Sequence, residues 1–78
     1  MPSDSLHEVF ALALGLPPAA ITEQLTYRAV PEWDSISHMA LVAALEERYR
    51  IRLATEDVLA LNSVARAREL LAKYQIQT

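Results

Sequence analysis

The sequence predicts an all-α protein folded as a small bundle of four helices. Three observations lead to this prediction. Apolar residues make up 53% of the 78 residues and recur at helical spacing. Only one glycine and four prolines interrupt the chain. Side chains that cap helices well, such as Asp34 and Ser63, stand directly before apolar segments. A chain of this length leaves room for one domain, residues 1–78.

The first helix is expected to begin near Ser5, because Ser5 and Glu8 have the spacing of a capping box. Its buried stripe would comprise Leu6, Val9, Phe10, Ala13 and Leu14. Gly15 and the two prolines after it should end this helix. The connection 17–32 is long for a small domain, and connections of that length are usually functional. We expect it to pack through Ile21, Leu25, Tyr27 and Val30.

The second helix should run from 36 to 49 with Asp34 as its N-cap, because this segment contains neither glycine nor proline. The spacing assigns one face to the core, with the residues Leu41, Val42, Leu45 and Tyr49. A second apolar strip flanks that face and consists of Ile36, Met39, Ala40 and Ala43. The helix therefore carries more apolar surface than one core face requires.

Two shorter helices are expected after an extended link at 51–53. Thr55 should cap a brief helix over 56–61, which has acidic residues in its first turn. Ser63 should cap the last helix, whose apolar residues are Val64, Ala67, Leu70, Leu71 and Tyr74. No internal repeat accompanies these elements.

Composition excludes several classes of function. Without cysteine, the chain has neither a thiol nucleophile nor a cysteine-ligated metal site. The net charge is −3, and residues 1–47 hold seven acidic residues against one basic residue, Arg28, which disfavours nucleic acid as a partner. Apolar runs such as 9–14 are far too short to span a bilayer. No signal peptide is apparent, so we expect a cytoplasmic monomer without membrane insertion. A domain this small also has little room for a catalytic cleft.

The dipeptide Asp34-Ser35 stands at the start of the second helix. Free backbone N–H groups and the positive end of the helix dipole favour an anion there, such as a phosphate attached to Ser35. An ordinary helix start is the alternative, because this dipeptide is common there. His38 lies three residues further on, but no third group or oxyanion hole supports a nucleophile–base pair. We expect His38 and His7 at the surface, and nothing pairs them for a metal.

A longer pattern resembles the acyl carrier protein family. It consists of Trp33-Asp34-Ser35-Ile36, then a helix through Leu45-Glu46-Glu47 to Tyr49, and then Ile51. The acidic short segment 56–58 and Ser63-Val64 follow in the order that this family shows. The resemblance covers the whole chain in length and element order, and its specific part runs from 33 to 64. It implies the four-helix bundle of acyl-carrier type, with a short third helix and a long loop between the first two helices.

The resemblance implies that Ser35 carries 4′-phosphopantetheine, transferred from coenzyme A by a phosphopantetheinyl transferase. The thiol of that arm would hold acyl groups as thioesters, so the chain would be a carrier and not an enzyme. The second helix would dock partner enzymes through Ile36 and Met39, with Glu46 and Glu47 supplying negative charge. Those partners would be an acyl- or aminoacyl-activating ligase, a ketosynthase, or an acyl or condensing transferase. The surplus of apolar residues on the second and third helices further suggests a cavity between them, lined partly by Met39, Val58 or Leu59, that would shelter an attached acyl chain.

Three readings of the function stay open at this stage. The second helix is less acidic than in the primary fatty-acid carriers, which favours a polyketide, specialised fatty-acid or related secondary-metabolite pathway. A discrete aminoacyl or peptidyl carrier of nonribosomal peptide type would share the fold and the modified serine. A helical protein-interaction module without a prosthetic group is the third reading. Loading assays would separate the first two readings, and loss of function in Ser35→Ala would separate both from the third.

Overall fold

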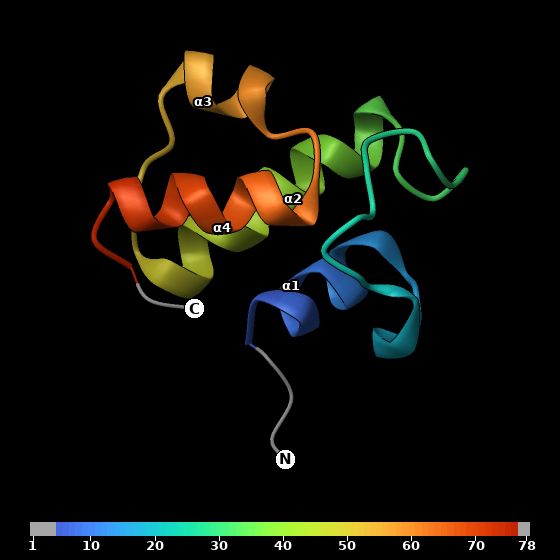
Figure 1. The fold of residues 1–78 in the computed structure, drawn as a ribbon. Helices are drawn as coiled ribbons and strands as arrows, with labels where there is room; N and C mark the ends of the chain where they lie inside the picture. The colour runs from blue at the N-terminus through green and yellow to red at the C-terminus, as the bar shows by residue number, and fades with distance from the viewer. Residues whose placement is uncertain (1–4, 77–78) are drawn as a thin grey trace.

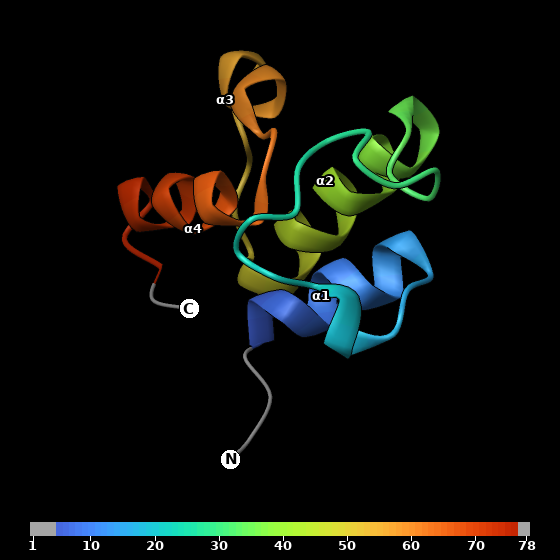
Figure 2. The same ribbon diagram turned by 45° about the vertical axis from the view of Figure 1, so that its right-hand side comes forward.

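The computed structural model describes residues 5–76, which form an all-helical bundle (Figures 1 and 2). Its elements are α1 (Ser5–Leu14), the 3₁₀ helix η1 (Pro18–Ala20), α2 (Ser35–Tyr49), α3 (Thr55–Ala60) and α4 (Val64–Lys73). The predicted fold class of four helices, with a short third helix and a long loop after the first, is confirmed. Within 5–76, no helix is both long and apolar enough to cross a membrane.

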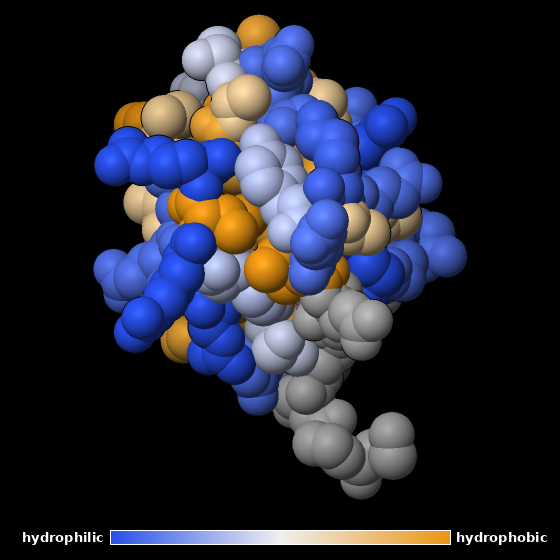
Figure 3. All heavy atoms as spheres, turned by 90° about the vertical axis from the view of Figure 1, so that its left-hand side faces the viewer, coloured by the Kyte–Doolittle hydropathy of each residue, from blue (hydrophilic) through white to orange (hydrophobic). Residues whose placement is uncertain are grey.

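The core lies where α1, α2 and α4 meet, and α1 and α2 run side by side in both ribbon views (Figures 1 and 2). Its largest fully buried side chain is Trp33, which belongs to the loop and not to a helix. The other fully buried side chains are Phe10, Leu6, Leu41, Leu45, Leu61, Leu71 and Val64. Ala11 is buried where the sequence favoured Ala13, which is only partly buried. On the face in Figure 3, hydrophilic side chains dominate and apolar ones show between them.

Two helix starts agree with the sequence and two differ in detail. Asp34 and Ser63 cap α2 and α4 as predicted, because their side chains accept the backbone N–H three residues later. The prediction for Thr55 is wrong: α3 includes it, and Ala54 stands at the cap without a side-chain bond. Tertiary contacts set this start, since the Ala54 N–H donates to the Tyr74 hydroxyl at 3.1 Å.

Ser5 is the first residue of α1 and not its cap, so the cap position lies outside the described residues. Its hydroxyl is 3.0 Å from the hydroxyl of Tyr49, the last residue of α2. This hydrogen bond joins the start of α1 to the end of α2 and fixes their antiparallel alignment.

Left-handed residues follow three of the helices. Gly15 has φ 69° after α1, Arg50 has φ 55° after α2, and Gln75 has φ 65° close behind α4. In each case the next residue donates its N–H to a carbonyl five positions earlier, as Ile51 does to Glu46 at 3.1 Å. Only Gly15 was predicted, because glycine alone adopts this conformation without a steric cost.

The long connection is fastened to the bundle at several points. Ile21 and Leu25 are buried as expected, and Tyr27 and Val30 pack against the core. Backbone bonds tie it to the start of α4, including Val64 N–H to the Leu25 carbonyl at 3.1 Å. Pro18 opens η1, which the sequence had not suggested.

Glu23 joins this connection to two helices. Its carboxylate accepts bonds from the Arg68 guanidinium at 3.0 and 2.8 Å and lies 2.8 Å from His7 Nε2. His7, expected at the surface of the first helix, is half-buried and lies against this carboxylate. The hydrogen bonds from Arg68, and then from His7, lower the pKa of Glu23 from 4.5 to about 2.

Glu23→Gln should make the protein less sensitive to acid. Because the pKa of Glu23 is lowered in the folded state, its contribution to stability is present above pH 4.5 and is lost as the pH falls towards about 2. Urea unfolding at a series of pH values should show the variant less stable at neutral pH, with the difference closing across that window. Glu47→Gln, at an exposed position, is the control. A difference that stays constant with pH would contradict this role for Glu23.

Arg50→Gly should stabilise the protein by about 1 kcal/mol, because glycine removes the steric cost of a left-handed residue. Denaturant unfolding measures the change. Arg52→Gly removes the same side chain from an exposed residue outside the left-handed region, so it should not stabilise the fold. Equal effects of the two substitutions would show that the backbone conformation at Arg50 is not the cause.

Candidate functional site

Ser35 is the first residue of α2, and its side chain is exposed. Asp34 precedes it, and the Asp34 carboxylate accepts the backbone N–H of Ser37 at 2.9 Å. This hydrogen bond lowers the pKa of Asp34, so the carboxylate is ionised next to the serine. The structure thus places an accessible hydroxyl beside a fixed negative charge, at the position that the sequence predicted.

An aromatic cluster holds the loop that leads into α2. We use this term for Phe10, Tyr27, Trp33 and His38. Trp33 packs edge-on against Phe10 with ring centroids 5.4 Å apart, and Tyr27 packs edge-on against Trp33 at 6.0 Å. The His38 ring stacks on Trp33 at an angle of 20°. The loop before Ser35 is therefore anchored in the core.

His38 occupies the centre of a hydrogen-bonded chain, so the expectation of a surface side chain is wrong. The indole N–H of Trp33 donates to His38 Nδ1 at 3.1 Å. An indole N–H can only donate, so Nδ1 accepts and the ring hydrogen is on Nε2. Nε2 then donates to the carbonyl of Val58 in α3 at 3.0 Å. Both ring nitrogens are engaged, so His38 is not placed to take a proton from Ser35.

The four residues proposed to dock partners differ in how far their side chains are exposed to solvent. Ile36 and Met39 are 81% and 60% exposed, and Glu47 is exposed as well. Glu46 is partly buried, and its carboxylate accepts the Leu53 N–H at 2.9 Å. Glu46 thereby braces the link between α2 and α3, and Glu47 keeps its carboxylate in solvent.

The residues proposed to line an acyl-chain cavity lie at an open surface. Leu59 is 79% exposed on α3, Met39 is exposed on α2, and Val58 packs partly against the core. Shelter of an acyl chain between these helices stays a prediction.

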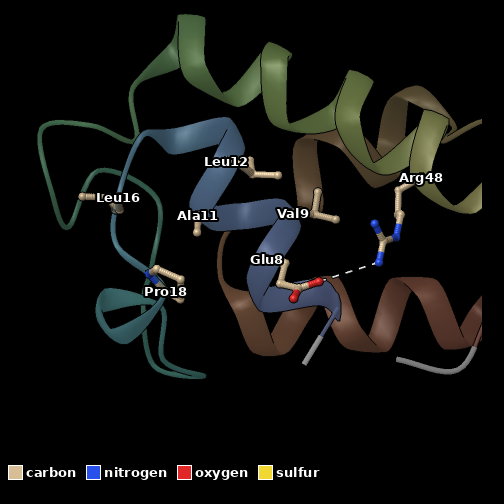
Figure 4. A pocket seen from close by; sticks show the side chains of 7 residues that line it. All are labelled: Glu8, Val9, Ala11, Leu12, Leu16, Pro18 and Arg48. Carbon is tan, nitrogen blue, oxygen red and sulfur yellow. Dashed lines mark ion pairs between the residues drawn. The ribbon is translucent and has the colours of Figure 1, made fainter. Parts of the chain in front are cut away.

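Two hollows of similar size lie elsewhere on the surface. One, of about 330 Å³, is bordered by α1, η1 and the end of α2, and its lining is mainly apolar (Figure 4). Glu8 and Arg48 form an ion pair of 3.7 Å at one side of it. The other, of about 320 Å³, is lined by Arg28, Val30, Pro31, Trp33 and Asp34, the residue before Ser35. The second hollow is the one next to the candidate site.

The groups around the Ser35 hydroxyl are held by hydrogen bonds within the fold. The hydroxyl is accessible and its neighbours are fixed, but the nearby histidine is already hydrogen-bonded on both sides. Among residues 5–76, no group of acidic or histidine side chains could hold a metal ion. Sequence reasoning missed Arg28, whose only signal was that it is the one basic residue before Arg48.

His38→Leu should destabilise the protein by about 1–3 kcal/mol, because it leaves the buried Trp33 N–H and the Val58 carbonyl without their partner. Urea unfolding followed by the fluorescence of Trp33, the single tryptophan, measures the loss. Met39→Leu, on an exposed neighbour, should change stability by less than about 0.5 kcal/mol. Equal stability of His38→Leu and the wild type would contradict the hydrogen-bonded chain.

Comparison with known proteins gives a direct result for most of the chain. A family model described as a phosphopantetheine attachment site matches residues 4–71. The matched range includes Ser35 and all of α1, α2 and α3. No curated protein matches the chain.

Proposed function

The chain belongs to the phosphopantetheine attachment-site family, and on this premise we propose that Ser35 bears the attached group. Carrier domains of this family hold 4′-phosphopantetheine covalently, and phosphopantetheinyl transferases and pathway enzymes are their general partners. When bound, the group supplies a thiol on which a cargo is held as a thioester. The protein is therefore a phosphopantetheine-carrying carrier, and the residue that holds the arm is the proposal.

The proposal rests on a comparison of the serines: which of them are hydrogen-bonded or half-buried, and which is exposed. Ser5 is hydrogen-bonded to Tyr49, and Ser63 caps α4 by accepting the Arg66 N–H. Ser37 is half-buried at the Asp34 cap. Ser35 is exposed, and its hydroxyl makes no hydrogen bond to any residue within 5–76. Of the serines in this range, Ser35 is thus the exposed one, and its hydroxyl is not engaged in the fold.

The chain's part in the modification is to present Ser35 Oγ. The oxygen attacks the phosphorus of coenzyme A that carries the pantetheine; an Oγ–P bond forms and the P–O bond to the adenosine bisphosphate breaks. The serine proton passes to the transferase, because His38 is occupied on both ring nitrogens. The ionised Asp34 lies where the transferase and its metal ion approach, and it holds the first turn of α2 in place.

Ser35→Ala should abolish the gain of one phosphopantetheine mass when the chain is incubated with coenzyme A and a broad-specificity phosphopantetheinyl transferase. Intact-mass spectrometry measures the gain. Ser37→Ala is the matched control, because it removes a serine of the same helical turn that faces the Asp34 cap; it should still be modified. Modification of Ser35→Ala would overturn the assignment.

No modification of the wild type, with a transferase active on a control carrier, would favour the helical interaction module over a loaded carrier. Function that survives Ser35→Ala would support that reading.

For the cargo, we propose acyl intermediates of a polyketide, specialised fatty-acid or related secondary-metabolite pathway. The exposed face of α2 supports this, because Ile36 and Met39 are open while the Glu46 carboxylate is used within the fold. A partner would meet apolar side chains and Glu47 there, rather than a row of carboxylates. An aminoacyl or peptidyl carrier of nonribosomal type is the alternative. Loading assays with an acyl-activating ligase and with an aminoacyl-activating enzyme separate the two cargo classes.

A further inference from the structure

The loop before α2 folds back on itself and brings Arg28 next to the attachment site. The Arg28 N–H donates to the carbonyl of Trp33 at 3.1 Å, and the Trp33 N–H donates to the carbonyl of Val30 at 3.1 Å. Trp33 stands two residues before Ser35. Arg28 is therefore close in space to Asp34 and Ser35, although it lies seven positions from Ser35 in sequence.

The Arg28 side chain is attached to the aromatic cluster. Its guanidinium lies over the Tyr27 ring, 5.7 Å from the centroid. Tyr27 in turn packs against His38 with centroids 5.2 Å apart. Arg28 also lines the hollow of about 320 Å³ that Asp34 borders. Arg28 thus lines a hollow that Asp34, the neighbour of Ser35 in sequence, also lines.

Arg28 differs from most other cations of the protein in having no carboxylate partner within 5–76. Arg48 pairs with Glu8 and Arg66 with Glu69. Arg68 and Lys73 likewise pair with Glu23 and Asp57. Within 5–76 the Arg28 guanidinium lies over the Tyr27 ring and forms no ion pair, and Arg28 is the one basic residue in the first 47. Its donors are available to a ligand.

A phosphodiester on Ser35 would bring a further negative charge to a loop end that already holds Asp34 and Glu32. Like charges at this separation repel, and the repulsion is relieved by a cation within reach. The planar fork of a guanidinium matches the oxygens of a phosphate and can donate two hydrogen bonds at once. Arg28 is the one residue of the loop with that chemistry.

We propose that the Arg28 guanidinium binds the phosphodiester that joins the arm to Ser35, within the hollow lined by Arg28 and Asp34. Arg28 is a positioning residue: it offsets the charge of Asp34 and orients the root of the arm, while the thiol end stays free. The proposal rests on attachment at Ser35. Its ligand is a phosphate in either case, whether the lasting phosphodiester or a phosphate of incoming coenzyme A.

The backbone offers a matched pair of variants. Arg28 and Arg50 are both left-handed, with φ 67° and 55°. Glycine suits that conformation, so Arg28→Gly and Arg50→Gly each remove a guanidinium without straining the fold. Arg50 follows the 15-residue α2 and is therefore about 22 Å from its start, beyond contact with a phosphate on Ser35. Any loss common to both variants is a backbone effect.

The experiment uses nuclear magnetic resonance of the isolated apo and holo proteins. On modification, the Nε–H resonance of Arg28 should shift more than that of Arg50. The ³¹P resonance of the holo protein should move in Arg28→Gly and stay in place in Arg50→Gly. Added salt should shrink the difference, because this ion pair is open to solvent.

The outcomes separate the two hypotheses. If no holo protein forms, or the group is found on another serine, the proposed function fails. If holo protein forms and the ³¹P resonance is the same in the wild type and Arg28→Gly, the contact with the phosphodiester is overturned while the function stands. A slower transfer from coenzyme A in Arg28→Gly with an unmoved ³¹P resonance would assign Arg28 to the incoming coenzyme, and it would also overturn the contact proposed here.

Discussion

The indole N–H of Trp33 needs an acceptor, because the side chain is fully buried although it belongs to a loop. His38 in α2 supplies that acceptor through Nδ1. Its other ring nitrogen, Nε2, donates a hydrogen bond to the Val58 carbonyl in α3. The buried Trp33 ring and the half-buried His38 ring thereby join the loop, the start of α2 and α3 to one another. Asp34 and Ser35 follow Trp33 directly, so the place of the exposed serine depends on this constraint.

The elements that could be predicted from sequence are those with a local cause. Asp34 and Ser63 cap their helices through side chains that reach their own first turn, and Gly15 ends α1 because glycine accepts a left-handed backbone. The prediction that Thr55 caps α3 was wrong: the cap position is Ala54, whose backbone N–H donates a tertiary hydrogen bond to the Tyr74 hydroxyl. The hydrogen bonds of His38 were not predicted for the same reason: one of its partners, the Val58 carbonyl, comes from another helix, and spacing along α2 does not contain it.

In the candidate site, too, features with a local cause were predicted, and features that depend on tertiary contacts were not. The resemblance pointed to Ser35 through its motif, and the structure adds why this serine is accessible while others in the described range are engaged. The sequence could not show that the Glu46 carboxylate accepts a hydrogen bond within the fold instead of facing a partner. Its donor, the Leu53 N–H, comes close to it only in the folded chain. The aromatic cluster anchors the loop before α2 in the core, and the exposed first residue of α2 is the proposed attachment position.

The measurement that tests the central claim most directly is fragmentation mass spectrometry of the modified wild-type chain, which locates the arm without any substitution. The five serines lie at 3, 5, 35, 37 and 63, so fragments between 35 and 37 separate the two in the first turn of α2. The account predicts the whole added mass on Ser35. An arm on Ser37 or on any of the other serines would contradict it.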